Sequence, residues 1–254
     1  MICLSLTRPT LDQDLTDLVA ERPYIDAAEL RADLLDPCEL TSVAGFARRV
    51  RGNAALGHLP LILTVRRAAD GGGWDGTERD RRVLLAEAVR DYAFVDLEDD
   101  LFADGSAASI AGGFSGRVIR SQHYFDGIPA DPTAELRRMG CDGAIAKLAA
   151  MPRSVADLLA LVRAARSTTE LDRIVVGMGE QGFPTRVLAR QLGSYVSFVS
   201  TGDRQAAPGH CTPRDLAELY RYHEVFRDAA VFAVIGNPVM HSQSPNYHNR
   251  VFAQ

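Results

Sequence analysis

Short runs of apolar residues recur along the chain, separated by longer stretches whose apolar positions follow a helical spacing. The short runs are rich in Val, Ile, Leu and Ala, which is typical of strands that are buried on both faces. Eight of these runs occur: Ile2–Leu6, Ala27–Leu34, Pro60–Val65, Ala93–Leu97, Arg117–Ser121, Gly143–Leu148, Arg173–Val176 and Tyr195–Val199. We expect each of them to form a β-strand.

Helical patterns lie between these strands. They include Leu40–Val50, Thr77–Asp91, Thr133–Met139, Val155–Ala165 and Thr185–Leu192, and a further helix is expected over Pro213–Phe226. Residues suited to capping precede two of them, Ser154 and Thr212. Strands that alternate with helices predict parallel βαβ units. Eight units within 254 residues favour an α/β fold of the closed (β/α)8 class, the TIM barrel, over an open doubly wound sheet.

A ninth apolar run, Val231–Ile235, is surplus to a closed barrel of eight strands. It leads into a polar stretch, after which the chain stops at Gln254. We therefore place a domain boundary near Asp228. Residues 1–227 are expected to form the barrel, and residues 228–254 are expected to be a short segment of an incomplete second α/β domain.

The composition is that of a globular protein, with 46% hydrophobic and 24% charged residues. A net charge of −5 gives no sign of a nucleic-acid-binding surface, and no apolar run reaches the roughly 20 residues that a membrane helix needs. The amino terminus lacks the features of a signal peptide. The four cysteines are scattered without metal-ligand spacing, so we expect reduced thiols, a cytoplasmic protein and no metal site.

Lys147 is the only lysine, although lysine and arginine together number 28. Arginine stays protonated, whereas a desolvated lysine can lose its proton and attack a carbonyl, so this position indicates a role that arginine cannot fill. Its neighbours in GAIAKLAA are small or apolar, and burial among them would favour the neutral amine. We expect Lys147 to form an imine with a ketone. The alternative is a structural lysine that reaches solvent or pairs with an acid.

His123 ends the strand that precedes the strand of Lys147, so the two side chains should converge over the barrel mouth. An imine enzyme needs an acid–base group that titrates near neutral pH, which histidine supplies. A structural histidine is the alternative. Asp70, just past the third strand, is a candidate to orient His123, and a solvated loop aspartate is an equally good interpretation.

Three arginines, Arg31, Arg66 and Arg186, fall at or shortly beyond strand ends. Guanidinium groups around one barrel mouth imply an anionic ligand, and their shape suits a carboxylate. Chance placement is the alternative in a chain so rich in arginine.

At these positions the sequence resembles the type I 3-dehydroquinate dehydratases. The motifs run in order along the chain: Glu29-Leu30-Arg31-Ala32-Asp33, Thr64-Val65-Arg66 with Asp70-Gly71-Gly72, Ser121-Gln122-His123-Tyr124-Phe125, Ala146-Lys147-Leu148-Ala149 with Met151-Pro152, Met178-Gly179 before Arg186, and Ala207-Pro208-Gly209. Each motif is weak alone, whereas their order and spacing are specific. The resemblance spans Ile2 to about Leu219 and implies a cofactor-free (β/α)8 lyase of the shikimate pathway, in a family that is usually homodimeric.

The resemblance also implies a role for each residue. Lys147 would form the imine with the C3 ketone of 3-dehydroquinate. His123 would remove the C2 proton and return one to the departing C1 hydroxyl, a syn elimination, and Arg186 would bind the substrate carboxylate. The other substrate-binding positions would be Ser5, Glu29, Arg31, Arg66, Ala206 and His210.

Several positions depart from the family pattern. Tyr124 stands where an aspartate is usual, and Asp70 is one methylene shorter than the usual glutamate near the histidine. In the closing segment, Ala206 lacks the usual hydroxyl and His210 replaces a glutamine. We expect these changes to affect substrate affinity and the pH optimum more than the reaction, because the lysine, the histidine and the carboxylate-binding arginine remain.

The last residues resemble the opening of shikimate dehydrogenase, through Val234-Ile235-Gly236-Asn237-Pro238, His241-Ser242-Gln243-Ser244-Pro245 and His248-Asn249. The resemblance implies that Ser242 and Ser244 bind the carboxylate and hydroxyls of shikimate. The nucleotide-binding half of such a domain would lie beyond Gln254, so NADP is expected only for a complete dehydrogenase domain. The chain is thus similar to the start of a fused dehydratase–dehydrogenase.

Two other functions stay open. A class I aldolase uses the same barrel and the same lysine chemistry, although the Pro-Gly segment and the position of Arg186 speak against it. The second is a barrel without catalysis that serves as a binding or scaffold domain, which the changes at Ala206 and His210 favour.

Overall fold

The structure is a computed structural model that describes residues 1–201, 211–236, 239 and 241–252. One sheet holds eight strands: β1 (Ile2–Leu6), β2 (Ala27–Arg31), β3 (Leu61–Thr64), β4 (Phe94–Glu98), β5 (Arg117–Tyr124), β6 (Ile145–Ala150), β7 (Arg173–Gly177) and β8 (Ser197–Val199). Neighbouring strands are parallel, in the order β7-β6-β5-β4-β3-β2-β1-β8. The sheet curls until β7 meets the chain just before β8, at an isolated bridge between Arg173 and Ser194. The predicted (β/α)8 barrel is therefore confirmed.

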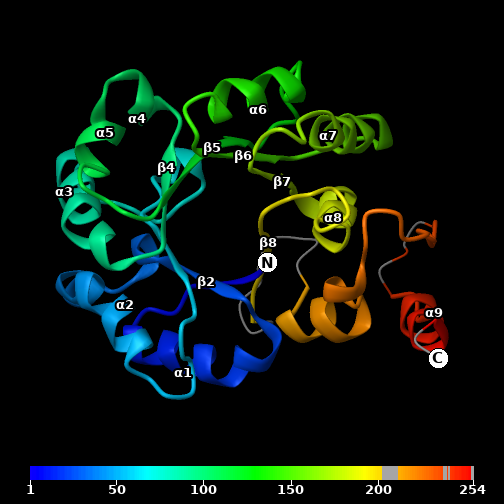
Figure 1. The fold of residues 1–254 in the computed structure, drawn as a ribbon, viewed down its shortest axis with the longest axis horizontal. Helices are drawn as coiled ribbons and strands as arrows, with labels where there is room; N and C mark the ends of the chain where they lie inside the picture. Colours follow the sequence, from blue (N-terminus) through cyan, green and yellow to red (C-terminus); the bar gives the residue numbers. More distant parts are fainter. Residues whose placement is uncertain (202–210, 237–238, 240, 253–254) are drawn as a thin grey trace.

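Helices surround these strands (Figure 1). The α-helices are α1 (Leu11–Glu21), α2 (Val43–Arg51), α3 (Glu78–Ala88), α4 (Asp100–Ala103), α5 (Ser106–Ile110), α6 (Pro132–Gly140), α7 (Val155–Ser167), α8 (Gly179–Val187) and α9 (Ser244–Phe252). Shorter turns are η1 (Arg22–Tyr24), η2 (Ala32–Leu34), η3 (Pro37–Ser42), η4 (Ala68–Asp70), η5 (Val89–Asp91), the π-helical η6 (Asp215–Leu219) and η7 (Tyr222–Glu224). Helix α9 lies outside the ring that the other helices form (Figure 1). None of the described helices has both the length and the apolar character needed to cross a membrane.

Alternation along the strands divides the core into an inner and an outer part. The inner part fills the barrel and consists of Cys3, Ala27, Ile62, Phe94, Ile119, Ile145, Ala149, Ile174, Val176, Val196 and Phe198. Residues between them, such as Leu4, Leu30 and Leu63, face outward and pack against the helices. Because successive side chains point to opposite faces, the polar residues that follow the inner apolar residues by two positions also point into the barrel.

The predicted strands are confirmed, with shifted ends. The strand β5 continues to Tyr124 and β6 continues to Ala150, because the last residues of the two strands pair with each other. His123 and Lys147 therefore lie within strands rather than at strand ends. The predicted helix Thr185–Leu192 is wrong in its position, since α8 spans Gly179–Val187 and holds Pro184 in its interior.

The region after the barrel differs from its prediction. The expected helix over Pro213–Phe226 is interrupted by Arg221, whose φ of 50° is left-handed, so η6 and η7 take its place. The expected strand Val231–Ile235 is wrong: these residues form no regular element, and Ile235 is 94% exposed. A lone strand would leave its backbone groups without ladder partners, and none of the described strands pairs with this run. The domain boundary near Asp228 remains a prediction.

Candidate active site

A layer of polar side chains lies inside the barrel, next to its apolar inner core. On three neighbouring strands, the residue two positions after an inward apolar residue is polar: Asp96 on β4, Ser121 on β5 and Lys147 on β6. The strand register pairs Ser121 directly with Lys147. None of the three is more than 5% exposed. Polar groups in an interior without water need hydrogen-bond partners, and here the partners lie on neighbouring strands.

The amine of Lys147 is held by carboxylates. Its Nζ donates a hydrogen bond to Asp96 Oδ2 at 2.7 Å and lies 4.0 Å from Glu29 Oε1. The Phe198 ring covers it, with the ring centroid 4.4 Å from Nζ. The expectation of purely apolar surroundings is therefore wrong. The apolar sequence neighbours, such as Ala146, point outward into the helical layer, so they do not contact the amine.

Asp96 is the centre of this polar layer, and the sequence analysis missed it. Besides Lys147, it accepts a hydrogen bond from Ser121 Oγ at 2.6 Å and lies 3.0 Å from Arg66 Nη2. Burial raises the pKa of the Asp96 carboxyl, but the charges of Arg66 and Lys147 outweigh burial and hold that pKa well below its usual range. The signal that could have revealed Asp96 is the alternation in Phe94–Glu98, which points Asp96 to the same side as Phe94.

Asp96→Asn is expected to lower the free energy of unfolding by about 3–5 kcal/mol, because removing one charge from a buried network leaves its partners uncompensated. Urea denaturation of both proteins measures this difference. The matched control is Asp100→Asn, since Asp100 is 59% exposed and pairs with Arg67 at the surface. The control is expected to cost less than ~1 kcal/mol. Equal losses in the two variants would contradict the central place of Asp96.

His123 lies on the same face of β5 as Ser121, two residues further along. Because Ser121 pairs with Lys147, His123 is a diagonal neighbour of Lys147 over the barrel interior. Its Nδ1 lies 3.5 Å from Arg66 Nη1, and its ring stacks on Phe125 with centroids 6.1 Å apart. Burial and the positive charges of Arg66 and Lys147 lower the pKa of His123 well below its usual value. The imidazole is therefore neutral at neutral pH and can accept a proton.

Arg66 connects this histidine to a second group of charges. Its Nη1 lies 3.0 Å from Ser121 Oγ and 3.4 Å from Glu98 Oε1. The other oxygen of Glu98 accepts a hydrogen bond from Arg81 of α3 at 2.8 Å. Burial disfavours the charge on Arg66, but the neighbouring carboxylates outweigh it and raise the pKa of Arg66. Arg66 is thus fixed by the protein itself, and sequence reasoning did not identify Arg81 as its support.

Ser5 and Glu29 lie together on β1 and β2, as their register requires. Ser5 Oγ donates to Glu29 Oε2 at 2.8 Å, and Thr64 Oγ1 donates to Glu29 Oε1 at 2.8 Å. Glu29 is 5% exposed, and Lys147 lies beside the same Oε1. The predicted pocket residues Ser5 and Glu29 are therefore brought to the lysine, with Thr64 as an unpredicted third member.

Arg31, at the end of β2, forms a bidentate ion pair with Asp33. The two hydrogen bonds measure 2.9 and 2.7 Å. The Asp33 carboxylate also accepts the Gly73 N–H at 2.9 Å, which ties the loop after β3 to β2. Arg31 follows Ala27 and Glu29 at alternate positions of β2, so it lies on the same face of the sheet as these two inward-facing residues.

Asp70 does not contact His123. Its Oδ2 accepts a hydrogen bond from Arg67 Nε at 2.7 Å, and Arg67 also pairs with Asp100. The expectation that Asp70 orients the histidine is corrected, because Arg67 follows Arg66 directly and points to the opposite side, where it holds the Asp70 carboxylate. Arg66 is the charged residue that contacts His123.

Arg186 on α8 has no carboxylate partner among the residues that the structure describes. Its Nη1 donates to the Phe198 carbonyl at 2.9 Å, while its buried Nε has no acceptor among these residues. The residue is 6% exposed, and this burial lowers the pKa of its guanidinium. The ring of the same Phe198 covers Lys147, so the guanidinium of Arg186 and the amine of Lys147 both contact Phe198. A buried guanidinium in this state is suited to a ligand carboxylate.

Four predicted site residues remain. Ala206 and His210 fall outside the described residues. Ser244 begins α9, and its N–H donates to Ser242 Oγ at 3.3 Å. Helix α9 stands apart from the barrel (Figure 1), so these two serines are not part of the site around Lys147.

Comparisons with known proteins identify the family of the chain. Residues 2–227 match the sequence model of the family described as type I 3-dehydroquinase. A bifunctional 3-dehydroquinate dehydratase/shikimate dehydrogenase of Arabidopsis thaliana is 32% identical over 205 residues, which cover 76% of this chain and 33% of that protein. The chain thus spans about a third of the length of that relative.

Two solved structures share the fold. The 3-dehydroquinate dehydratase of Geobacillus kaustophilus matches with a TM-score of 0.74 and 27% identity, covering 88% of this chain and 92% of that one. The dehydroquinate dehydratase and shikimate dehydrogenase of S. pombe matches with a TM-score of 0.70 and 24% identity, covering 99% of this chain and 50% of that one. The second match shows likeness of fold alone.

Proposed function

Because this chain belongs to the type I 3-dehydroquinase family, we propose that it removes water from 3-dehydroquinate to give 3-dehydroshikimate, a step of the shikimate pathway. The observation that carries the proposal is the buried amine of Lys147, the chain's only lysine, inside the polar layer of the barrel. A carbon–oxygen bond beta to a ketone breaks readily once that ketone is an imine, and an amine is the group that makes one.

The reaction proceeds through a covalent intermediate. Lys147 Nζ attacks the C3 carbonyl, and loss of water leaves a protonated imine between Nζ and C3. The imine acidifies the C2–H bond, so His123 takes the C2 proton as an enamine forms. The enamine electrons expel the C1 hydroxyl, which leaves as water with the proton that His123 returns. A second water molecule hydrolyses the conjugated imine and frees Lys147.

The described side chains support this assignment. His123 is the diagonal neighbour of Lys147, and its lowered pKa keeps it neutral for proton removal. Arg186 is a buried cation beside Phe198 with no carboxylate partner among the described residues, which fits the single carboxylate of the substrate. Ser5 and Glu29 present oxygen atoms on the opposite side of the polar layer, suited to the ring hydroxyls.

Borohydride trapping tests the proposal. Sodium borohydride added with 3-dehydroquinate is expected to reduce the imine and attach the substrate carbon skeleton permanently to Lys147. Peptide mass spectrometry locates the adduct, and the absence of other lysines from the sequence makes the assignment direct. An unmodified Lys147 in a sample that turns over 3-dehydroquinate would rule out the imine route.

The same experiment separates the dehydratase from a class I aldolase. A parallel sample receives sugar phosphates instead of 3-dehydroquinate. The dehydratase is expected to be trapped by 3-dehydroquinate alone, because Arg186 offers a carboxylate site near the amine. Trapping by a sugar phosphate, with none by 3-dehydroquinate, would favour the aldolase.

We propose further that residues 228–254 open a second domain of the shikimate dehydrogenase type, in which Ser242 and Ser244 bind shikimate. The Arabidopsis relative is bifunctional in this combination, and the S. pombe fold match extends over 99% of this chain. Phe232 is 75% exposed and Ile235 is 94% exposed. Exposed apolar side chains of this size are expected where another part of a domain would cover them.

Limited chymotrypsin digestion tests the boundary near Asp228. Phe226 and Phe232 are both exposed, so cleavage there is expected to release the carboxyl-terminal segment. Dehydratase turnover of the remaining barrel is expected to stay unchanged, since no side chain of the polar layer comes from the released part. Mass spectrometry follows the cleavage. A loss of turnover in step with cleavage would contradict the boundary.

A further inference from the structure

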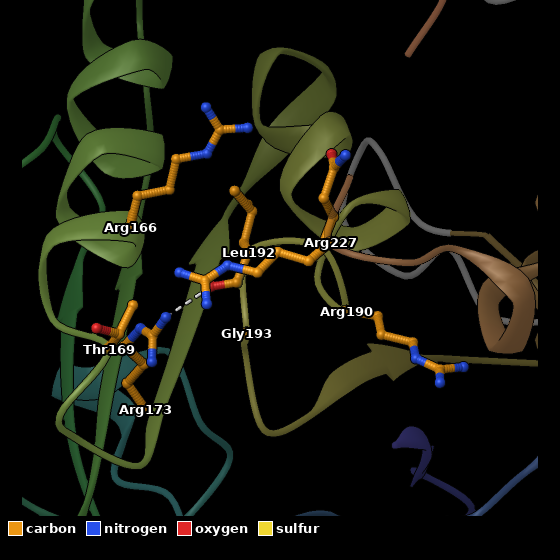
Figure 2. Close-up of a pocket in the computed structure, with 8 residues that line it drawn as sticks. Arg166, Thr169, Arg173, Arg190, Leu192, Gly193 and Arg227 are labelled. Atoms are coloured by element: carbon orange, nitrogen blue, oxygen red, sulfur yellow. Dashed lines mark hydrogen bonds between the residues drawn. The ribbon is translucent and has the colours of Figure 1, made fainter. Parts of the chain in front are cut away.

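A cavity of about 480 Å³ lies outside the barrel wall, at the end of the barrel where the chain enters β7 and β8 (Figure 2). Its lining comes from the end of α7, the following turn and the start of β7, from the chain between α8 and β8, and from Arg227. The barrel wall separates this cavity from Lys147, because the side chain of Arg173 points outward from β7 while Ile174 points inward. The volume is in the range of small-molecule sites.

Arginines dominate the lining. They are Arg166, Arg173, Arg190 and Arg227, and none of the lining residues is acidic. Figure 2 shows Arg227 reaching across the cavity toward Arg173, with Arg166 above them, whereas Arg190 points away. Arg190 is engaged by the His223 carbonyl and the Phe226 ring. Three guanidinium groups therefore remain at the cavity.

Arg173 is a buried part of the cavity wall and is held by hydrogen bonds. The residue is 5% exposed, and its N–H groups donate to the carbonyls of Ala165, Leu171 and Leu192 at 2.7, 3.1 and 2.8 Å. A guanidinium has more N–H donors than these bonds use. Gly193 leaves the room that it needs, since a Cβ there would lie 2.8 Å from Arg173 Nη2.

The positive charge at the cavity is not balanced within the described residues. Burial lowers the pKa of Arg173, and the charge of Arg227 adds to this effect against the opposing influence of Glu170 and Asp172. Those two carboxylates form their ion pairs outside the cavity. Glu170 lies 3.2 Å from Arg137, and Asp172 lies 2.8 Å from Arg117.

Thr169 and Gln191 are the uncharged polar residues of the lining. The Nε2 of Gln191 donates to the Ala229 carbonyl at 2.8 Å, which fixes the amide. Its Oε1 is buried and has no donor among the described residues. The cavity therefore offers three guanidinium groups, a combination that suits an anion with several oxygen atoms.

We propose that this cavity binds a small organic phosphate. Arg166, Arg173 and Arg227 hold the phosphoryl oxygens. A doubly charged phosphoryl group with three terminal oxygens matches three guanidinium groups better than a single carboxylate does. Since Arg227 follows the barrel whereas Arg166 and Arg173 belong to it, the ligand also joins the segment after the barrel to the barrel wall.

Titration calorimetry with glycerol 3-phosphate, at constant ionic strength, tests the site on the full chain. The double variant Arg166→Gln/Arg227→Gln is expected to bind at least ~10-fold more weakly than the wild type, the scale of one lost charge-assisted hydrogen bond. Both side chains are exposed, and among the described residues neither forms a hydrogen bond or an ion pair that the substitutions would remove. The matched control is Arg163→Gln, an exposed arginine of the same helix outside the cavity, which is expected to change affinity by less than ~2-fold.

Two results would overturn the proposal. One is equal affinity for glycerol 3-phosphate in the wild type and the double variant, which would place the anion elsewhere, including the barrel mouth. The other is tighter binding of malonate than of glycerol 3-phosphate, which would assign the cavity to carboxylates. An amide NMR shift of Gly193 on addition of glycerol 3-phosphate, absent from the double variant, is the expected local signature.

Discussion

Lys147→Arg is expected to lower the turnover of 3-dehydroquinate by at least ~10⁴-fold, the scale of removing a covalent nucleophile. Arginine keeps a positive charge beside Asp96 and Glu29, so the polar layer retains its charge balance. It stays protonated and cannot form the imine. The fold is therefore expected to survive while the chemistry is lost. Steady-state assays measure the turnover, and circular dichroism with urea denaturation checks the fold.

The wild type assayed beside Lys147→Arg also decides between an enzyme and a barrel without catalysis. Measurable activity in the variant would refute the imine mechanism. Negligible turnover in both proteins would instead favour a binding or scaffold domain. Arg81→Lys is a suitable comparison, because it makes the opposite exchange, from arginine to lysine, at another buried position. Arg81 supports Glu98 from α3 and does not contact Lys147.

His123→Ala is expected to form the imine but to turn over at least ~10²-fold more slowly, the usual scale for losing a general acid–base group. The variant keeps the Lys147 amine and its Asp96 partner, so borohydride still traps the substrate. Single-turnover assays and trapping measure the two steps separately. The control is His58→Ala, an exposed histidine, which is expected to leave both steps unchanged. A rate near that of the wild type would remove His123 from the mechanism.

The pH profile of the wild type gives an independent measure of His123. Its imidazole must be neutral to take the C2 proton, and protonation at low pH removes that ability. Because burial and the charges of Arg66 and Lys147 lower its pKa, the acid limb of kcat/KM is expected well below the usual histidine range. This limb is expected to disappear in His123→Ala.

The repeating strand pattern was enough to predict the barrel. All eight apolar runs became strands of one parallel sheet, since a run buried on both faces has few other stable states in a chain that alternates with helices. The ends were less predictable. Gln122–Tyr124 is polar and aromatic, and it is in a strand only because β6 pairs with it. Val231–Ile235 looks like a strand, yet no described strand is there to receive it.

The candidate site was predictable in its residue types and less so in its contacts. Lys147 and His123 stood out because a lone lysine and a strand histidine are unusual in apolar surroundings. Asp96 did not stand out, because its partners Arg66, Ser121 and Lys147 come from other parts of the chain and meet it only in the folded barrel. Asp70 was assigned to the histidine from its position just past the third strand, while the contact with Arg67 arises from the local turn η4.

The barrel is a rolled sheet whose two edges meet at β7 and β8. Seven neighbouring pairs share continuous ladders, but this last junction has one bridge, helped by a bond from Tyr195 N to the Arg173 carbonyl. Small opening motions should therefore begin there rather than between β4, β5 and β6. Arg186 and Phe198 lie next to this junction, whereas Lys147 and His123 lie on strands that pair with a neighbour on each side through continuous ladders. The part of the site that we propose to bind the substrate carboxylate is therefore expected to move more than the strands that hold the amine and the imidazole.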